Sequence, residues 1–511
     1  MSRTARFFLL LTSLSFGGLK AAVAQSPLPT GLPPFGTFDR DAIDTINLGN
    51  LNIHFEFPVF AKKGRGLDFY ANLIHDNTMY TPTTSGCSPQ CWQVNYFDTT
   101  WQMSAPLTDR VTFYQPTQQT PCTDTNTGRQ YWNYIYTNWV YVDTKQTPHS
   151  FFFSIGAPIA CYSTQSGTFT SSDGLYVLSV SLDPNTAAIT NETVTDLSGN
   201  IRNMLNGILT DPNGNQITST WTDTTANTAL VSTGTTQQPS WKYPNPAGGI
   251  SEVVATTSST FTLQTNFHCP NLLDLNQSGT SLTTSISLPD GTSYGIVYES
   301  TTGTYPSTIV TGRIHSLTLP SGGLITYTYS GGTSGVNCQD GSPATLTKQT
   351  PDGTWTYNHS FTPTTQPNGL WTTVVTDPSG NDTVYTFGSI PLTTIPAGPT
   401  YEDQRLMYQG SRTSGTLLKK IVTCYNGNFT NCETALNLQG NTPITISRTD
   451  VYTYLTGLQP SLSETFSFRT LPTQINEFDF GVNTGAAPTT VPLKATKTTY
   501  ASLNGIWNRV G

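Results

Sequence analysis

Residues 313–329 read RIHSLTL-PSGG-LITYTY, and this stretch decides the expected fold. Proline presets φ and glycine accepts a positive φ, so the four central residues predict a tight turn. Every second residue on either side of the turn shares one face: His315, Leu317 and Leu319 before it, then Ile325, Tyr327 and Tyr329 after it. Alternation with a period of two is typical of strands. The stretch therefore predicts an antiparallel hairpin.

Similar turn signals recur along the chain. Asp caps such a turn, and Gly or Asn takes the positive φ. The signals lie at 172–174, 196–200, 211–215, 290–291, 352–353 and 377–381. An early hairpin is also expected, turning at Gly49-Asn50. Hairpins in series predict an extended sheet or spiral built by repetition.

Composition gives the same fold class. The 511 residues include 91 threonines, 43 glycines and 34 prolines, whereas only 11% are charged. The residues of long helices and coiled coils are therefore scarce. Hydrophobic residues make up 36% and aromatic residues 11%, enough to bury a core. We expect an all-β protein of antiparallel hairpin arrays with little helix. The net charge of −8 without a basic block argues against a nucleic-acid partner.

Residues 1–24 predict a secretory signal peptide. Arg3 and Arg6 precede an apolar run, and Ala22-Val23-Ala24 provides the small residues of a cleavage site between Ala24 and Gln25. No apolar run reaches the roughly 20 residues of a membrane span, so no transmembrane segment is expected in the mature chain. The expected location is outside the cytoplasm: secreted, at the cell surface, or in the periplasm.

Five segments resemble degenerate YD repeats of the RHS-repeat family: 312–318, 322–329, 350–357, 376–381 and 47–51. The last is similar to the opening of large secreted bacterial RHS-repeat proteins, notably acidobacterial ones. In that family the repeats wind into a β-sheet spiral or shell, often around a C-terminal toxin, and eukaryotic relatives act in adhesion. This chain has no run of full repeats and no toxin-like domain before Gly511. It resembles the segment preceding the repeats, from a reading frame expected to be truncated.

The resemblance and the composition together suggest five regions. A Pro/Gly-rich leader at 25–44 follows the signal peptide. The next expected regions are an aromatic-rich, β-sandwich-like part at 45–270, YD-repeat-like hairpins of a β-sheet spiral at 271–400, and a C-terminal β region at 401–511. Within the aromatic-rich part, 131–141 predicts one or more strands buried on both faces.

Eight scattered cysteines suit disulfides in an oxidising compartment. Sequence allows 105 pairings. The best local candidates are Cys424 with Cys432, across a turn, and Cys87 with Cys91. A zinc site lacks the paired spacing it requires.

Three motifs could carry chemistry. Gly291-Thr292-Ser293-Tyr294-Gly295 matches the nucleophile elbow of hydrolases, but its context predicts a hairpin. The histidines, at 54, 75, 149, 268, 315 and 359, show no metal spacing. Residues 211–215 offer oxygens to calcium but lack the other ligands of a calcium loop, so a turn is expected. We expect no catalytic residue, metal or cofactor.

Two functions remain open at this stage. One is a non-enzymatic exported scaffold, the N-terminal part of an RHS-type surface or secreted protein, acting in adhesion, presentation or encapsulation of a downstream part. Its partners would be downstream RHS repeats or cell-surface glycans and proteins. The alternative is a carbohydrate-binding or carbohydrate-active protein that stacks sugars on Trp92 or Trp132. Against it, Trp92, Trp101, Trp132 and Trp139 are expected to be core residues.

Overall fold

The structure is a computed structural model that describes most of the chain from residue 31 onward. The described residues are 31–33, 36–77, 80–84, 86–94, 101–114, 120–123, 128–158, 162–362, 370–389, 400–427, 432, 445–468, 471–482, 491–503 and 506–509. Within these ranges the regular structure is β-strand, without a helix. The predicted all-β class is therefore confirmed.

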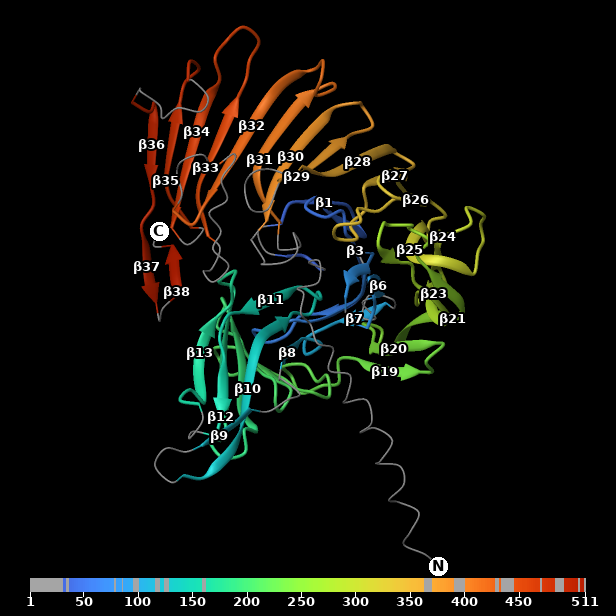
Figure 1. Ribbon diagram of the computed structural model, residues 1–511, viewed down its shortest axis with the longest axis vertical. Coiled ribbons are helices and arrows are strands. Elements are labelled where there is room, and N and C mark those ends of the chain that lie inside the picture. The colour runs from blue at the N-terminus through green and yellow to red at the C-terminus, as the bar shows by residue number, and fades with distance from the viewer. Residues whose placement is uncertain are drawn as a thin grey trace, which may run out of the picture.

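One antiparallel sheet of 17 strands dominates the molecule, and its strands follow one another in chain order. In Figure 1 they curve from β19 and β20 over the top of the molecule to β36. The strands are β19 (Val231–Gly234), β20 (Pro239–Pro244), β21 (Ile250–Gln264), β23 (Asn276–Ser287), β24 (Ser293–Ser300), β25 (Ile309–Thr318), β26 (Leu324–Ser330), β27 (Thr345–Thr350), β28 (Gly353–Thr362), β29 (Leu370–Thr376), β30 (Asp382–Ser389), β31 (Thr400–Gln409), β32 (Thr416–Tyr425), β33 (Ile446–Thr453), β34 (Ser461–Phe468), β35 (Leu471–Phe478) and β36 (Lys494–Lys497).

The hairpin predicted at 313–329 forms β25 and β26 of this sheet. Leu317 pairs with Ile325, and Gly322 has the positive φ that the turn requires. β21 also pairs in parallel with β25, so that the sheet closes on itself locally. The sheet runs across residues 270 and 400, where the sequence suggests changes of region; that division stays a prediction.

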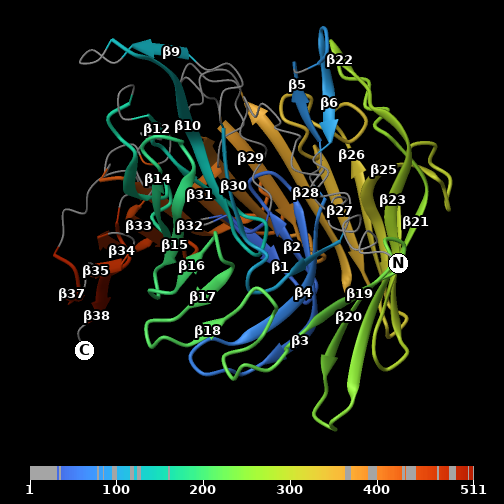
Figure 2. The ribbon, with the colours of Figure 1, turned by 90° about the horizontal axis from the view of Figure 1, so that it is seen from below.

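A second sheet lies inside the curve of the first, as Figures 1 and 2 show. Its five strands are ordered β1 (Phe38–Arg40), β2 (Asp44–Asn47), β3 (Ile53–Lys62), β4 (Phe69–Asp76) and β7 (Gln102–Ser104). β2 and β3 form the expected early hairpin, in which Ile46 pairs with Ile53. We call these five strands the inner sheet.

A third part of the chain packs beside these sheets around its own core. β10 (Gln130–Val142) is a single 13-residue strand that pairs with β8 (Arg110–Tyr114), β9 (Thr120–Thr123), β11 (Pro148–Phe151) and β12 (Ile155–Ala157). The adjacent six-stranded sheet comprises β13 (Ser166–Thr170), β14 (Tyr176–Leu182), β15 (Ile189–Asp196), β16 (Ile201–Asn203), β17 (Ile208–Thr210) and β18 (Gln216–Ile217). Two small sheets complete the described strands: β5 (Tyr80–Thr83) with β6 (Gln90–Val94) and β22 (Leu272–Leu273), and β37 (Tyr500–Leu503) with β38 (Ile506–Arg509).

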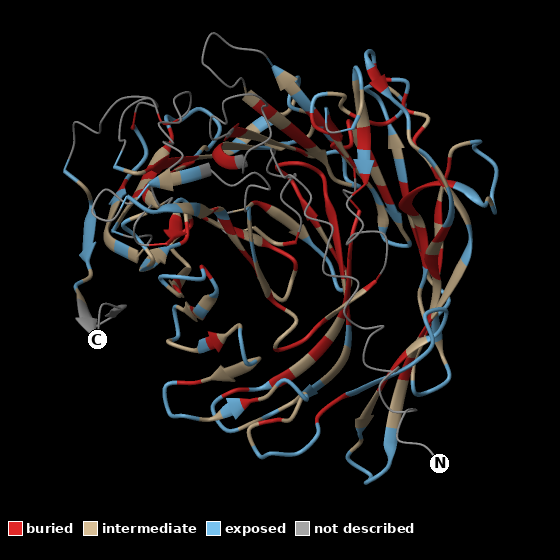
Figure 3. Ribbon diagram, turned by 60° about the horizontal axis from the view of Figure 1, so that its bottom comes forward, coloured by how far each residue is buried: buried red, intermediate tan, exposed pale blue. Residues whose placement is uncertain are grey.

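The main hydrophobic core lies between the inner sheet and the large sheet. Phe55 and Phe57 of β3 share it with Tyr327, Tyr357 and Trp371 of the large sheet. Figure 3 shows buried residues concentrated on the strands inside the curve and on those that face them. Two smaller cores lie around Trp139 of β10 and around Tyr452 of β33. The curved sheet is therefore filled by the N-terminal strands.

Candidate functional site

The most extensive polar arrangement among the described residues lies where the inner sheet meets the large sheet. We call it the interior seam. Its members are side chains from residues 37–80 together with partners on β25, β26, β27, β28, β29 and β31. Most of these groups are buried, and such groups are costly unless they are hydrogen-bonded.

Asp44 is at the centre of the seam. Its side chain is buried completely, and its Oδ1 atom lies 2.7 Å from the Nζ atom of Lys348, which is itself 7% exposed. Tyr327 donates its hydroxyl to the other carboxylate oxygen of Asp44. Asp41 lies 3.2 Å from the same lysine. Burial, followed by the negative charge of Asp44, raises the pKa of Tyr327 well above its usual value. The tyrosine therefore stays a donor at physiological pH.

Three further contacts continue the seam along β28, β29 and β31. Tyr357 of β28 donates to Asp39 at 2.5 Å, and Thr373 of β29 donates to the Leu48 carbonyl at 2.5 Å. Thr37 donates to Glu402 of β31. The two oxygens of Glu402 also accept hydrogen bonds of 2.9 and 2.7 Å from Arg405. Strands β28, β29 and β31 of the large sheet are thus each tied to residues on or next to β1 and β2.

The other end of the seam is built on β25. Asn77 accepts a 2.8 Å hydrogen bond from the Ile314 backbone N–H and donates to the Tyr329 hydroxyl. Tyr80 donates to the Thr311 carbonyl. Nearly every contact in the seam joins residues more than 200 positions apart in the chain. The carboxylates are occupied by donors, which is an arrangement that fixes strands in place.

A second buried cluster surrounds His149 on β11. Its Nδ1 atom lies 2.6 Å from Asp173 and its Nε2 atom 3.4 Å from Asp143. Burial alone would lower the pKa of His149, but the hydrogen bonds to Asp143 and Asp173 raise it to about 9. Ser171 donates to Asp173 rather than to the histidine. A protonated imidazole cannot act as a base. The charged ring of His149 instead connects Asp143 and Asp173 through ion pairs. Sequence reasoning missed this cluster, because the turn signal at 172–174 indicates a local role for Asp173 and no pattern connects it with His149 or Asp143.

Ser293 does not lie on a nucleophile elbow. It is exposed at the start of β24 and pairs with Ser287 across a tight turn, where Gly291 has a φ of +84°. A strand follows it, whereas an elbow requires a helix. His315 contacts the Tyr327 carbonyl, and His359 contacts Thr373. Neither His315 nor His359 is therefore hydrogen-bonded to Ser293.

Residues 211–215 form the expected turn. The Oδ1 atom of Asp211 accepts hydrogen bonds from the backbone N–H groups of Asn213 and Asn215, at 2.9 and 2.8 Å. Its Oδ2 atom accepts the Asn215 side-chain amide at 2.8 Å. The oxygens proposed for calcium are thus used within the turn. In the part of the chain that the structure describes, no group of three or more His, Cys, Asp or Glu residues could hold a metal ion.

The aromatic-rich region divides into core and surface. Trp92, Trp101 and Trp139 are 1%, 7% and 0% exposed, so these are core residues as expected. Trp92 cannot stack on a sugar, because Tyr80 and Phe267 pack against its ring. Trp132 is different, with 57% of its side chain exposed on β10. The first half of β10 is exposed in alternation, and only its end is buried on both faces.

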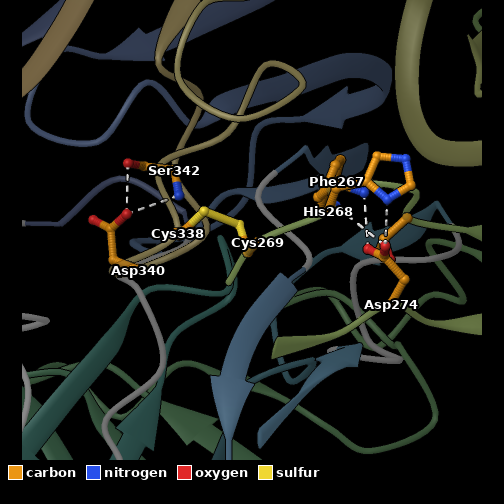
Figure 4. Close-up of a disulfide and its surroundings, with 8 residues drawn as sticks. Phe267, His268, Cys269, Asp274, Cys338, Asp340 and Ser342 are labelled. Atoms are coloured by element: carbon orange, nitrogen blue, oxygen red, sulfur yellow. Dashed lines mark hydrogen bonds and ion pairs between the residues drawn. A yellow bond between two sulfur atoms is a disulfide. The ribbon is translucent and has the colours of Figure 1, made fainter. Parts of the chain in front are cut away.

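Three disulfides are described in full. Cys87 is bonded to Cys91 and Cys424 to Cys432, the two local pairs favoured by sequence spacing. Cys269 is bonded to Cys338 across 69 residues, a pairing that spacing did not indicate. Figure 4 shows this third bond beside Asp340, whose carboxylate accepts hydrogen bonds from Ser342. Cys122 is also disulfide-bonded, whereas Cys161 lies outside the described residues.

The predicted signal peptide, with Ala24 and Gln25, lies outside the described residues. Across the ranges that are described, no helix long and apolar enough to span a membrane occurs.

Comparison with known proteins adds little. No family model matches the chain, and no curated protein matches it. Among solved structures, the crystal structure of TcdB2-TccC3-Cdc42 has 10% sequence identity and a TM-score of 0.18, and the match covers 86% of this chain and 23% of that one. The crystal structure of TcdB2-TccC3-TEV has 11% identity and a TM-score of 0.12, with 89% and 22% covered. The chain thus spans less than a quarter of either, and TM-scores this low support no inference.

Proposed function

We propose that this chain is an exported, non-enzymatic β scaffold, the N-terminal part of an RHS-repeat-type surface or secreted protein that presents or encloses a downstream part. The observation that carries the proposal is the interior seam. Its buried carboxylates and hydroxyls hold a long, curved sheet onto a filling sheet, strand by strand. Many of the buried polar groups therefore hold the large sheet in its curved shape.

Two other features support the proposal. Disulfides such as Cys269–Cys338 persist in oxidising compartments, which agrees with the signal peptide expected at residues 1–24. Strand β36 is exposed at every residue and ends the large sheet. An exposed edge strand is a surface on which further strands can pair.

The experiment expresses the full chain in a Gram-negative host with an epitope fused after Gly511, beside a variant lacking residues 1–24. The epitope should leave the cytoplasm only with the signal peptide. On intact or outer-membrane-permeabilised cells, its accessibility to antibody indicates presentation, and its protection from added protease until unfolding indicates enclosure. Retention of the full chain in the cytoplasm would overturn the proposal. So would labelling by a fluorophosphonate probe that is abolished by Ser293→Ala.

The alternative, a carbohydrate-binding function of the aromatic-rich region, now depends on Trp132. Its exposed ring on β10 is the specific observation that favours it. Pull-down on insoluble cellulose, chitin and starch should then fail for Trp132→Ala. Phe152→Ala is the matched control, because Phe152 is 52% exposed in the same region. Equal binding by both variants and the wild type would exclude stacking on Trp132.

A further inference from the structure

Lys348 has an unusual place for a lysine. It lies on β27, where its neighbours across the ladders are Tyr327 of β26 and Trp355 of β28. In the part of the chain that the structure describes, it is the only buried lysine, with 6% of the residue exposed. By comparison, Lys145 is 39% exposed in its ion pair with Glu56. A lysine amine that is removed from water acts as a nucleophile once it is neutral.

Two carboxyl groups and a hydroxyl surround the Lys348 amine. Its Nζ atom lies 2.7 Å from Asp44 Oδ1, and the Asp44 side chain is completely buried. Tyr327 donates its hydroxyl to Asp44 Oδ2. Asp41, whose side chain is 55% exposed, has its Oδ2 atom 3.2 Å from the same Nζ atom. The site therefore contains an amine against a carboxyl group, a hydrogen-bond donor to that carboxyl group, and a second carboxylate that can transfer protons.

The surroundings of these groups exclude water. Tyr327 is 0% exposed and packs edge-on against Phe55, with 5.6 Å between the ring centroids. Both rings belong to the main hydrophobic core, together with Ile46 of β2. Exclusion of water makes the charges of an ion pair costly, and it protects an amide formed there from hydrolysis. The fixed contact also raises the effective concentration of the amine at the carboxyl group.

We propose that Lys348 Nζ forms an isopeptide bond with Asp44 Cγ, and that Asp41 is the acid–base group of this reaction. One proton first passes from the ammonium to Asp44 Oδ1, which gives a neutral amine and a neutral carboxylic acid. Nζ then attacks Cγ, and the Tyr327 hydroxyl stabilises the negative charge that develops on Oδ2. Asp41 takes a proton from Nζ and passes it to Oδ1, which leaves as water. The products are one amide and one water molecule, and Asp41 ends as the carboxylate from which it began.

The contacts of the ion pair are also those that the product needs. The amide oxygen, Oδ2, keeps the hydrogen bond from Tyr327, and Asp41 accepts the remaining N–H. The bond joins β2 of the inner sheet to β27 of the large sheet covalently, once in each chain, so the scaffold stays non-enzymatic. The ion pair is the unreacted state, and a free energy of unfolding attributed to the pair applies to that state. The inference depends neither on export nor on a downstream part of the protein.

Peptide mapping of the full chain tests the bond. The purified protein is kept folded at pH 7 and 37 °C for one week, then reduced, alkylated and digested with trypsin, which does not cleave after an acylated lysine. Residues 41–62 should be joined to residues 314–405, with a mass one water molecule below the sum of the two peptides. This species should account for most of the chain. Fragment ions of residues 41–43 should be unmodified, which places the bond at Asp44 rather than at Asp41.

The same digest contains a matched control. Lys145 lies 2.9 Å from Glu56, which is in the same 41–62 peptide, but this pair is 39% and 27% exposed. Residues 130–145 should therefore be recovered as a free peptide. Complete cleavage after Lys348 in the folded chain would overturn the proposal. A loss of water from 41–62 alone, which indicates a cyclised aspartate, or an equal yield of a bond at Lys145, would overturn it too.

Two variants separate the roles of the groups. Lys348→Arg keeps a positive charge beside Asp44 but has no amine to acylate, so the joined peptide should be absent. Asp41→Asn keeps the contact between Lys348 and Asp44, and should slow the appearance of the joined peptide about a hundredfold, the lower end of the usual contribution of a positioned acid–base group. The linked fraction is followed over the same week. An unchanged rate in Asp41→Asn would overturn the role of Asp41, and a joined peptide in Lys348→Arg would overturn the assignment of the amine.

Discussion

Two halves of the same 17-stranded sheet differ in what lies against them. Strands β25–β30, the covered half, face the inner sheet and contribute completely buried rings to the main core, such as Tyr327 and Trp371. Strands β32–β36, the C-terminal half, have a small core of their own, and several apolar residues on them or in their connections are exposed, such as Leu418 of β32 at 42% and Leu458, between β33 and β34, at 56%. Both halves are antiparallel hairpins, but charged residues are more frequent on the strands of the C-terminal half. Burial therefore goes together with both the presence of a partner sheet and the lower charge of the strands that face it.

The largest expected difference concerns large apolar side chains. Trp371→Ala removes a ring that is 1% exposed and packs on His359 and Phe361. We expect it to lower the free energy of unfolding by about 3–5 kcal/mol. Leu458→Ala, in the C-terminal half, should change it by less than about 0.5 kcal/mol. Urea unfolding followed by circular dichroism measures both. Similar losses would contradict the division into a covered and a C-terminal half.

Replacing a buried charged residue should also lower the free energy of unfolding more than replacing an exposed one, although by less than Trp371→Ala does. Asp44→Asn weakens a pair whose members are 0% and 7% exposed, and should cost about 3 kcal/mol. The loss lies at the lower end of the usual range because Asp41 still contacts Lys348. Glu477→Gln breaks an exposed pair with Lys494 in the C-terminal half and should cost less than about 0.5 kcal/mol. A smaller loss for Asp44→Asn than for Glu477→Gln would show that the seam does not hold the sheets together.

The seam also marks how far the sequence could predict the fold. The hairpin at 313–329 and the turn at 211–215 were predictable, because alternation and turn residues act over a few positions. The contacts of Asp44 with Tyr327 and Lys348 were not, since they join residues about 300 positions apart and neither partner has a local signature. For the same reason, the sequence indicated hairpins in series without indicating what fills their curve.

The candidate sites also differ in whether the sequence could predict them. The hairpin context of Ser293 and the core role of Trp92 followed from local pattern. The roles of His149 and His359 did not, because each depends on tertiary neighbours that single-sequence reasoning cannot place. Asp173 reaches His149 from another strand pair. The Leu48 carbonyl, in the turn between β2 and β3, accepts the hydrogen bond of Thr373, which also contacts His359.

A buried acid next to the boundary between the halves should make stability depend on pH. Asp403 on β31 is 1% exposed, and neither of its carboxylate oxygens has a hydrogen-bond partner. Burial, and then the negative charge of Glu402, raise the pKa of Asp403 to about 8. The folded state thus holds this proton more tightly than the unfolded chain, so its contribution to stability is lost as the pH rises from about 4 to about 8.

Asp403→Asn removes this titration. The stability of the variant relative to the wild type should therefore increase between pH 4 and pH 8, by at most about 1.4 kcal/mol per pH unit. Urea unfolding at pH 5, 6, 7 and 8 measures the trend. Asp290→Asn is the control, because hydrogen bonds from Thr292 lower the pKa of this exposed turn carboxylate. Its effect should not vary across that range. A constant difference for Asp403→Asn would mean that this carboxyl is ionised in the folded protein.

The smallest difference between two regions of the molecule is expected at turns, because the hydrogen bonds of a turn are local. Asp377 caps a turn beside the covered half and accepts hydrogen bonds from the Ser379 and Asn381 N–H groups at 2.8 and 2.9 Å. Asp196 makes the same contacts, with Ser198 and Asn200, in the third part of the chain.

Each Asp→Ala change, at 377 or at 196, should cost about 1 kcal/mol, because each removes net hydrogen bonds from an exposed turn. The two costs should agree, since both arise within five consecutive residues. They would be measured in the same urea series as the other variants. If the turn at 377 proved far more sensitive, its role would extend into packing against the covered half. Equal losses of unfolding free energy would explain why these turns can be predicted from the sequence, whereas the burial of the strands between them cannot.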